Sequence, residues 1–324
     1  MITIIYFDGI KSQNISFEEF KQKFPNSQGF FWIDLSAPTD EENNLILKDT
    51  FKFHPLTIED AIIFNDHPKI DEYDDYLFIA FHSLFYHDED NRIATWEIDF
   101  FVAKNFLVTT HLKPIPYVEE VKQELLIKDQ LATKGIDFIV ARVMGLMIKS
   151  YIPVLKKVAK KLDEVEKEVL SKAEDDTIND IYKIKRNLSL VRKILMPQLE
   201  VIEELMKYEN SYFSEDSIMY YNEIINDLEQ IKNTLNDYIE MSRDTLDAQL
   251  SISSYKMNIV MKRLTVIMTI VMPLTFLTGV GGMSEYTMMT GGEDKWVWSY
   301  LGFGFSCIIV GYLTYLYLKK NKWV

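Results

Sequence analysis

Two long stretches without a charged residue lie near the C-terminal end of this sequence. Residues 264–284 form an uncharged window of 21 residues, and residues 296–318 form a second one of 23 residues. A helix needs about 20 apolar residues to cross the hydrocarbon core of a bilayer. Two buried helices of a soluble core are the alternative, but windows of this length with sharp charged edges are rare in soluble domains. The sequence therefore predicts two membrane-spanning helices.

The residues that flank these windows predict an orientation in the membrane. Aromatic side chains gather at both edges of the second window, as in interfacial belts: Trp296, Trp298, Tyr300, Tyr315, Tyr317 and Trp323. Basic residues precede the first window and follow the second: Lys256, Lys262, Arg263, Lys319, Lys320 and Lys322. By the positive-inside rule we expect a multi-pass protein of the cell (inner or plasma) membrane, with both termini cytoplasmic and residues 285–295 outside. Because two helices cannot enclose a hydrophilic path, transport would require an oligomer.

Charge and motif content argue against several other classes of protein. The 324 residues suffice for roughly two domains. The formal net charge of −14 repels phosphates, so we expect no nucleic-acid partner. A single cysteine, Cys307, forbids an internal disulfide and a cysteine-based zinc site. The sequence contains no Gly-rich phosphate loop, no Gly-x-Ser-x-Gly and no His-Glu-x-x-His. We therefore expect neither an enzyme nor an organic cofactor.

The N-terminal part, residues 1–135, is expected to be a cytosolic α/β domain with a mixed sheet. Short segments rich in β-branched and aromatic residues predict strands at 1–7, 29–34, 76–85, 95–103 and 106–110. Ser16 and Glu19 have the spacing of a capping box and predict the start of a helix. Pro55 predicts the start of another helix, which carries Glu59 and Asp60.

Residues 136–257 are expected to form a cytosolic region of long helices, the stalk. We predict one helix over 136–172 with a possible kink at Pro153, and a second whose N-cap is Thr177. A third is expected to run without a break from Ser217 to about Val280, and so from the stalk into the pore region, residues 258–324. Such a helix would carry a signal from the cytosol to the membrane.

Several motifs, in order along the chain, resemble those of the CorA family of divalent-cation channels. They are His54-Pro55-Leu56-Thr57-Ile58-Glu59-Asp60, Ile184-Lys185-Arg186-Asn187-Leu188 with the following Val191-Arg192-Lys193 and Pro197, Met272-Pro273-Leu274-Thr275-Phe276, and Lys319-Lys320-Asn321-Lys322-Trp323. The resemblance implies a funnel-shaped homopentamer in the lipid bilayer, in which the first span lines a central pore.

The predicted pore mouth departs from the family signature. The family has Gly-Met-Asn after a tyrosine, whereas this chain has Gly281-Gly282-Met283-Ser284. Ser284 hydroxyls would replace the ring of asparagine carbonyls, and the backbone carbonyls of Gly281 and Gly282 would also contribute. Glu285 from each subunit would form an acidic mouth that concentrates cations. The alternative is that the glycines simply end the helix and Ser284 faces water.

A stripe of residues on the first span recurs at spacings of three and four and shares one helical face. Methionine stripes commonly mean helix packing, but the resemblance implies that these positions line the pore. It implies a hydrophobic gate at Met261, Leu264, Met268 and Met272, and polar rings at Asn258 and Thr275. An apolar constriction of this kind can close by dewetting.

The acidic composition suggests regulation by the transported ion itself. Five copies at −14 each repel one another, and divalent cations that bridge carboxylates between subunits would relieve this repulsion. The resemblance implies a metal site at Asp60, with Glu223 as its partner on the stalk and Glu59 as a further ligand. The alternative is that Glu59 and Asp60 form a solvated helix face.

The sequence thus predicts a channel for divalent cations that passes a hydrated ion and closes when cytosolic ion binds between subunits. Mg²⁺ is expected as both transported and regulatory ion, with Co²⁺ and Ni²⁺ as further substrates. A zinc transporter of the same superfamily and a non-conducting membrane scaffold are the two alternatives.

Overall fold

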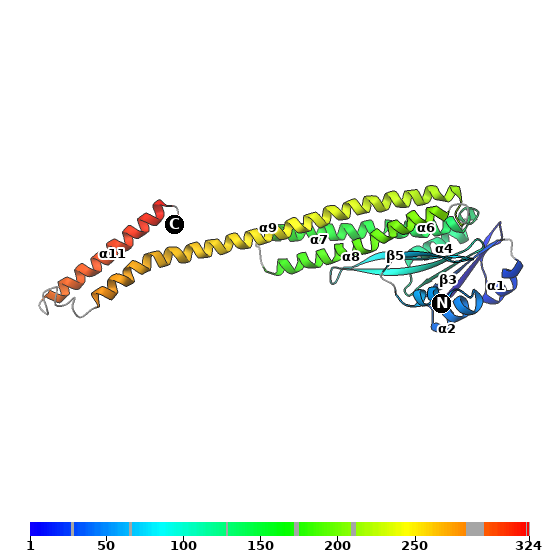
Figure 1. The fold of residues 1–324 in the computed structure, drawn as a ribbon, viewed down its shortest axis with the longest axis horizontal. Coiled ribbons are helices and arrows are strands. Elements are labelled where there is room, and N and C mark those ends of the chain that lie inside the picture. Colours follow the sequence, from blue (N-terminus) through cyan, green and yellow to red (C-terminus); the bar gives the residue numbers. More distant parts are fainter. Residues whose placement is uncertain are drawn as a thin grey trace. The chain divides into compact units, whose positions relative to one another are not determined.

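The structure, a computed structural model, describes residues 1–26, 29–64, 67–127, 129–171, 175–208, 212–282, 295–321 and 323. It divides into two compact units, Met1–Leu246 and Asp247–Val324, which we describe separately. Figure 1 shows the chain from the N-terminal strands to the last helix.

Within the described residues, seven strands form one sheet in the first unit, in the order β2-β1-β3-β7-β6-β5-β4. The strands are β1 (Ile2–Phe7), β2 (Ser12–Asn14), β3 (Phe30–Ser36), β4 (Lys69–Glu72), β5 (Leu77–His87), β6 (Arg92–Val102) and β7 (Phe106–His111). Strands β3 and β7 are parallel, whereas the other neighbours are antiparallel, which confirms the predicted mixed sheet. The short strands β2 and β4 were not predicted, because three or four half-polar residues carry too little of the alternating pattern.

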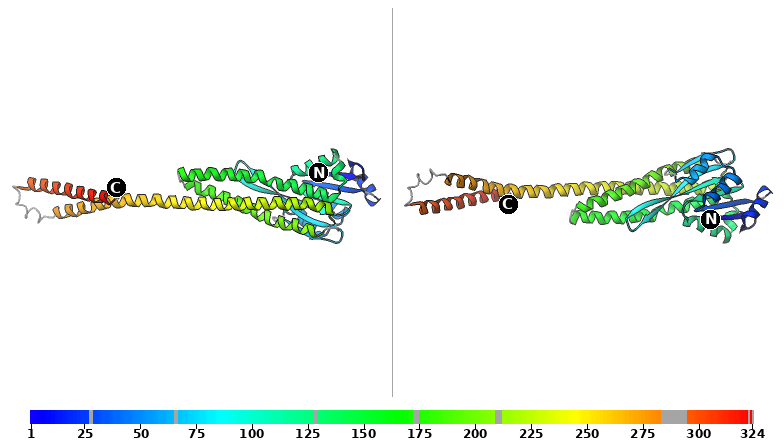
Figure 2. Two further views of the ribbon diagram at one scale, coloured as in Figure 1. Left: turned by 90° about the horizontal axis from the view of Figure 1, so that it is seen from above. Right: turned by 90° about the horizontal axis from the view of Figure 1, so that it is seen from below.

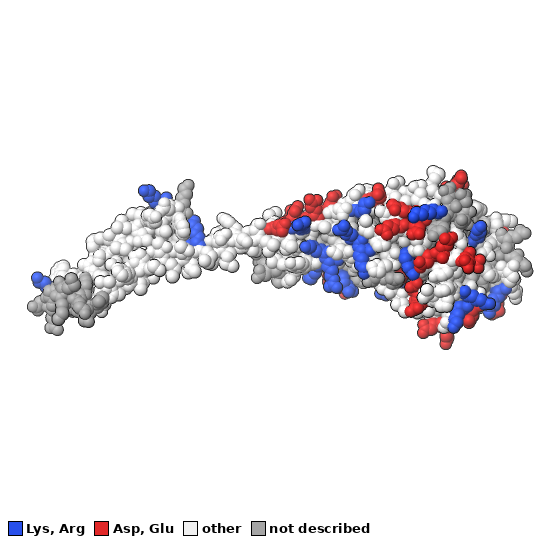
Figure 3. Space-filling view, viewed as in Figure 1, with Lys and Arg blue, Asp and Glu red and all other residues white. Residues whose placement is uncertain are grey.

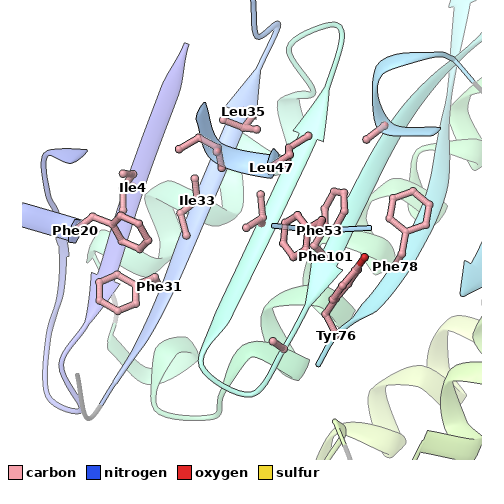
Figure 4. Close-up of a cluster of buried hydrophobic side chains, with 14 of the residues drawn as sticks. Ile4, Phe20, Phe31, Ile33, Leu35, Leu47, Phe53, Tyr76, Phe78 and Phe101 are labelled. Atoms are coloured by element: carbon pink, nitrogen blue, oxygen red, sulfur yellow. The ribbon is translucent and has the colours of Figure 1, made fainter. Parts of the chain in front are cut away.

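One face of the sheet is covered by short helices over an aromatic core. They are α1 (Phe17–Lys23), η1 (Phe24–Asn26), α2 (Asp40–Asn43), η2 (Asn44–Thr50) and α3 (Pro55–Ile62). Phe20, Phe31, Phe53 and Phe101 are buried among them (Figure 4). The Phe53 and Phe101 rings stack with centroids 4.2 Å apart. Edge-to-face and offset ring pairs add to the free energy gained by burying this area.

Local capping explains where two of these helices begin. Ser16 accepts a hydrogen bond from the backbone of Glu19, whose carboxylate accepts one from the backbone of Ser16, which confirms the predicted capping box. At the start of α3, Nδ1 of His54 accepts from the backbone N–H of Leu56 at 3.3 Å. The Thr57 hydroxyl donates to the carbonyl of His54 at 2.8 Å. The His-Pro-Leu-Thr sequence is therefore a helix start, which places Glu59 and Asp60 on α3.

Longer helices cover the opposite face of the sheet. They are α4 (Pro116–Ile127), α6 (Ile136–Lys149), α7 (Tyr151–Ser171) and α8 (Asp175–Leu205). The short helix α5 (Asp129–Ala132) lies between α4 and α6 in the sequence, and η3 (Met206–Tyr208) follows α8. Helices α6, α7 and α8 contact β5 and lie along the sheet in all views (Figures 1 and 2).

Two details of these helices differ from the prediction. The single helix expected over 136–172 is interrupted at Ser150, because Pro153, in the first turn of α7, cannot donate to the carbonyl of Lys149 and would clash with it. Thr177 is not an N-cap. It lies inside α8, which begins at Asp175, and its side chain is buried.

The predicted long helix is confirmed as α9 (Glu215–Gly281), an uninterrupted run of 67 residues. In the first unit it packs through buried residues at helical spacing: Tyr221, Ile224, Leu228, Ile231 and Leu235. The hydroxyl of Tyr221 donates to the carbonyl of Asp137 at 3.1 Å. The hydrogen bond from Tyr221 fixes the part of α9 in the first unit to α6.

The second unit contains the rest of α9 and helix α11 (Trp296–Lys320). Few charged side chains appear on this apolar part of the chain, in contrast to the mixed charges on the first unit (Figure 3). Small residues let the two helices approach. A Cβ at Gly281 would lie 2.9 Å from the Phe303 ring, and a Cβ at Gly311 would lie 3.8 Å from Leu274.

Candidate ion pathway and regulatory sites

Among the described residues, three helices are long and apolar enough to cross a membrane, but they differ in burial. The most apolar stretch of Ile136–Ser171 is 67% buried inside the chain, so it belongs to the soluble core. The corresponding stretches of Glu215–Gly281 and Val297–Lys320 are only 6% buried. Exposing two apolar helices of this length to water would cost too much free energy. Lipid or other subunits must therefore cover them.

The predicted pore-lining side chains all lie on the exposed surface of α9 in the single chain. Met261, Leu264, Met268 and Met272 are between 52% and 65% exposed, and Asn258 and Thr275 are exposed as well. No described part of the chain therefore fills the space in front of this stripe. The arrangement suits a surface that faces copies of itself or a lumen.

The Thr275 hydroxyl is suited to face a cation. Its Oγ1 donates a hydrogen bond to the carbonyl of Val271 at 3.0 Å, one turn earlier in α9. The hydroxyl proton is occupied in this hydrogen bond. The lone pairs of the hydroxyl oxygen remain free to accept hydrogen bonds from other groups. Thr275 can therefore present an oxygen to a hydrated ion without disturbing α9.

The predicted pore mouth is described only in part. Gly281 is the last residue of α9 and is buried against Phe303 of α11, while Gly282 is exposed and donates its N–H to the carbonyl of Thr278 at 3.0 Å. Met283, Ser284 and Glu285 lie outside the described residues. The role of Gly281 and Gly282 in ion selectivity stays a prediction. The structure shows that Gly281 also packs against Phe303.

The predicted regulatory carboxylates have partners within their own chain. The Nζ atom of Lys69 lies 2.7 Å from Oδ2 of Asp60 and 2.8 Å from Oδ2 of Asp71. These hydrogen bonds and charges outweigh burial and raise the pKa of Lys69. Glu223 lies 3.4 Å from the Nζ atom of Lys149 and is exposed. Glu59 is exposed on α3.

A single chain does not present a complete metal-ligand set. Among the described residues, no three His, Cys, Asp or Glu side chains come together closely enough to hold a metal ion. The lysine partners of Asp60 and Glu223 were missed by the sequence analysis. Lys69 stands nine residues beyond Asp60 on a strand that was not predicted, so no periodic pattern connected them.

A buried polar network lies on the face of the sheet that α4 covers, and the sequence analysis did not predict it. Asp34 accepts hydrogen bonds from Thr109 at 2.7 Å and from Lys122 at 2.9 Å, and its Oδ1 lies 3.1 Å from Nε2 of His111. Burial raises the pKa of Asp34, but the hydrogen bond and charge of His111 and the charge of Lys122 outweigh it and hold the pKa below its ordinary value. The network ties α4 to β3 and β7.

The fold and the exposed apolar helices define an integral membrane protein with a large extramembrane domain. Its sequence matches the model of the CorA-like Mg²⁺ transporter protein family over residues 27–320, and the chain therefore belongs to this family. Members of the family are divalent-cation transporters and not enzymes. The predicted class of function, transport of divalent cations without enzymatic activity, is therefore confirmed.

Known relatives support this assignment along nearly the whole chain. The chain is 28% identical to the putative metal ion transporter YfjQ of Bacillus subtilis, with 98% of this chain and 97% of the relative covered. It is 26% identical to the cobalt/magnesium transport protein CorA of Thermotoga maritima, with coverages of 97% and 92%. Its fold matches the complete structure of the CorA magnesium transporter from Methanocaldococcus jannaschii with a TM-score of 0.84, at 18% identity and coverages of 100% and 99%.

Proposed function

We propose that this chain forms a homopentameric channel that conducts hydrated divalent cations, with Mg²⁺ as the preferred ion and Co²⁺ and Ni²⁺ as further substrates. The observation that carries the proposal is the contrast in burial between comparable apolar helices. The apolar stretches of α9 and α11 are 6% buried, whereas that of Ile136–Ser171 is 67% buried. The exposed pair would cross the bilayer over residues 264–284 and 296–318, with both termini in the cytoplasm.

An oligomer is needed because one chain cannot surround an aqueous path. The stripe from Asn258 to Thr275 is exposed in the single chain and has a polar residue at each end, Asn258 at its N-terminal end and Thr275 at its C-terminal end. In a pentamer these positions would become rings of oxygen atoms separated by an apolar section. Polar rings accept a hydrated ion, while the apolar section controls whether water fills the path.

Mg²⁺ favours a pathway of this kind, because it gives up its inner waters reluctantly and prefers six oxygen ligands at about 2.0–2.1 Å. Neutral oxygens such as the Thr275 hydroxyl can hydrogen-bond to the outer side of those waters. We propose that Ser284, the backbone of Gly281 and Gly282, and Glu285 complete the filter at the outer mouth, and that Met283 shapes it.

We propose that cytosolic Mg²⁺ closes the channel by binding between subunits at Asp60 and Glu223, with Glu59 as an additional ligand. The ion must bind the closed state more tightly than the open one to shift the equilibrium. A lysine of the same chain competes with Mg²⁺ for each of the two carboxylates, since Asp60 and Glu223 both contact one. The affinity for Mg²⁺ is therefore set by the exchange of an ammonium group for a divalent ion.

Flux into proteoliposomes with fluorescent reporters for Mg²⁺, Zn²⁺, Co²⁺ and Ni²⁺ tests the proposal. We expect Mg²⁺ uptake that cobalt hexaammine, a stable mimic of hydrated Mg²⁺, inhibits. Zinc uptake that ignores cobalt hexaammine would favour the zinc transporter instead. Vesicles that remain impermeable to all four ions would identify a non-conducting scaffold, and a monomeric state in detergent and lipid would refute the pentameric pore.

A further inference from the structure

A small cavity in the sheet unit contains a buried carboxylate that the proposed transport does not use. The cavity has a volume of about 320 Å³ and lies beside α3 and the strands β6 and β7. Ala61 and Phe64 line it from the α3 segment and its end, and Thr95, Trp96, Glu97 and Asp99 line it from β6. His111, Leu112 and Lys113 line it from the end of β7, so one lysine also borders the cavity.

Asp99 is the unusual member of this cavity. The residue is only 3% exposed, and its Oδ1 atom makes no hydrogen bond to any described residue. A buried carboxylate without a partner loses its hydration without compensation, which is costly. Burial, followed by the negative charges of Glu97 and Asp60, raises the pKa of Asp99 well above its ordinary value, and the positive charge of Lys69 offsets only part of this. This position therefore calls for a positive ligand or a proton.

The register of the sheet places a second carboxylate beside it. Glu97 and Asp99 are two residues apart on β6, so their side chains leave the same face of the strand. Both line the cavity, and each raises the negative potential felt by the other. Trp96, the residue between Thr95 and Glu97, also borders the cavity, although its ring leaves the other face of β6 and stacks on Phe85; its buried indole Nε1 has no hydrogen-bond partner among the described residues. Water molecules around a bound ion can satisfy such a group.

From this geometry we infer that the cavity binds one hydrated divalent cation through Glu97 and Asp99, within a single chain. Two carboxylates are enough, because Mg²⁺ commonly keeps several of its waters and binds through one or two protein carboxylates. The missing third protein ligand agrees with the absence of a three-residue ligand set in the described part of the chain. The inference does not depend on conduction, since the site lies in the extramembrane unit.

The site is distinct from the proposed site between subunits but is electrostatically linked to it. Asp60 lies on α3 next to Ala61, which lines the cavity, and its charge acts on Asp99. A cation at Glu97 and Asp99 would reduce the negative field around Asp60. Occupancy of the cavity would then weaken cation binding at Asp60, so the two sites would oppose each other.

Equilibrium binding to the full-length protein in detergent, after removal of metal, tests the inference. Mn²⁺ is counted by electron paramagnetic resonance, and Tb³⁺ is detected through emission sensitised by Trp96. We expect Asp99→Asn and Glu97→Gln each to lose one bound Mn²⁺ per chain or to bind it at least about ten-fold more weakly. Mg²⁺ should displace Tb³⁺ from the wild-type protein.

Three control variants make the result specific. Trp96→Phe should lose the sensitised Tb³⁺ emission but keep the bound Mn²⁺, which locates the ion at the cavity. Asp90→Asn removes one carboxylate from the exposed end of the same hairpin and should change neither signal. Asp60→Asn should keep the sensitised emission, which separates this site from the one between subunits.

Two outcomes would overturn the inference. One is an unchanged number and affinity of bound Mn²⁺ in both Asp99→Asn and Glu97→Gln. The other is sensitised Tb³⁺ emission that survives in Trp96→Phe. Asparagine at 99 replaces a buried acid by a neutral side chain of the same shape, so the fold should persist. If that variant does not fold, Glu97→Gln decides alone. None of these measurements requires flux, so a protein that binds the ion here but does not conduct would refute only the proposed function.

Discussion

The Nζ atom of Lys69 lies 2.7 Å from the Oδ2 atom of Asp60, so the carboxylate proposed to bind regulatory Mg²⁺ already holds a positive charge from its own chain. Lys69 comes from the edge strand β4 and Asp60 from α3. A regulatory ion must displace this ammonium group or share the carboxylate with it. In the proposed mechanism the pair would therefore raise the Mg²⁺ concentration that closes the channel.

We first predict that Lys69→Gln lowers the cytosolic Mg²⁺ concentration that closes the channel. Both partners are about one-third exposed, and such pairs contribute about 0.2–1 kcal/mol, so the shift should be at most about five-fold. Flux into proteoliposomes at graded internal Mg²⁺ measures it. Lys69→Arg keeps the charge and should behave like the wild type. Asp60→Lys should shift the dependence in the opposite direction, and wild-type inhibition in that variant would exclude the site.

The second prediction concerns the proposed hydrophobic gate on α9. Leu264→Gly or Met261→Gly should make flux less dependent on cytosolic Mg²⁺, because a shorter side chain lets water remain in the constriction. Val266→Gly also places a glycine in this helix but on another face, and its cost in helix propensity is smaller than the about 1 kcal/mol that separates glycine from alanine. We expect Val266→Gly to retain normal regulation. Unchanged regulation in both gate variants would show that the stripe does not form the gate.

A third prediction separates packing from selectivity at Gly281. A Cβ at this position would lie 2.9 Å from the Phe303 ring, so Gly281→Leu should overpack the contact between α9 and α11 and destabilise it by about 1–3 kcal/mol. Thermal unfolding in detergent measures the loss, and Phe303→Ala should restore part of it. If the double variant regains stability but not ion selectivity, Gly281 also serves the filter. Recovery of both properties would leave it with packing alone.

The fourth prediction concerns acid stability of the sheet unit. Asp34→Asn should destabilise the fold by about 1–3 kcal/mol at neutral pH, because the Lys122 ammonium loses its buried partner and keeps only the exposed carboxylate of Glu119. The native pKa of Asp34 lies below its unfolded value, so its contribution is complete above the ordinary value of 3.8 and is lost as pH falls through the native pKa. Denaturant midpoints followed by Trp32 fluorescence at several pH values measure this.

Two comparisons test the cause of that loss. Asp34→Asn should show a smaller decline in stability at acidic pH than the wild type, since the titrating group is gone. Asp90→Asn removes an exposed carboxylate and should change stability by no more than about 0.5 kcal/mol. A wild-type acid profile in the Asp34→Asn protein would contradict the assignment.

Patterns that depend on neighbours in the sequence were predicted well. The continuous apolar run that ends α9, the capping box at Ser16 and Glu19, and the β5 and β6 strands all follow from spacing along the chain. Features that arise from contacts between residues far apart in the sequence were not predicted. The Asp34–Lys122 pair joins positions 88 residues apart, and Lys69 reaches Asp60 from the strand β4, which the sequence pattern did not predict.

Periodicity and uncharged length are local properties, so they were enough to predict a mixed α/β domain, long helices and two uncharged segments of membrane-spanning length. The folded chain then buries the apolar stretch of Ile136–Ser171 and leaves those two segments exposed, since burial depends on what packs against a helix and not on its composition alone. It also decided that Asp60 faces Lys69 and that Asp99 faces a cavity without a partner. Charges act through space, and the folded chain sets the distances between them.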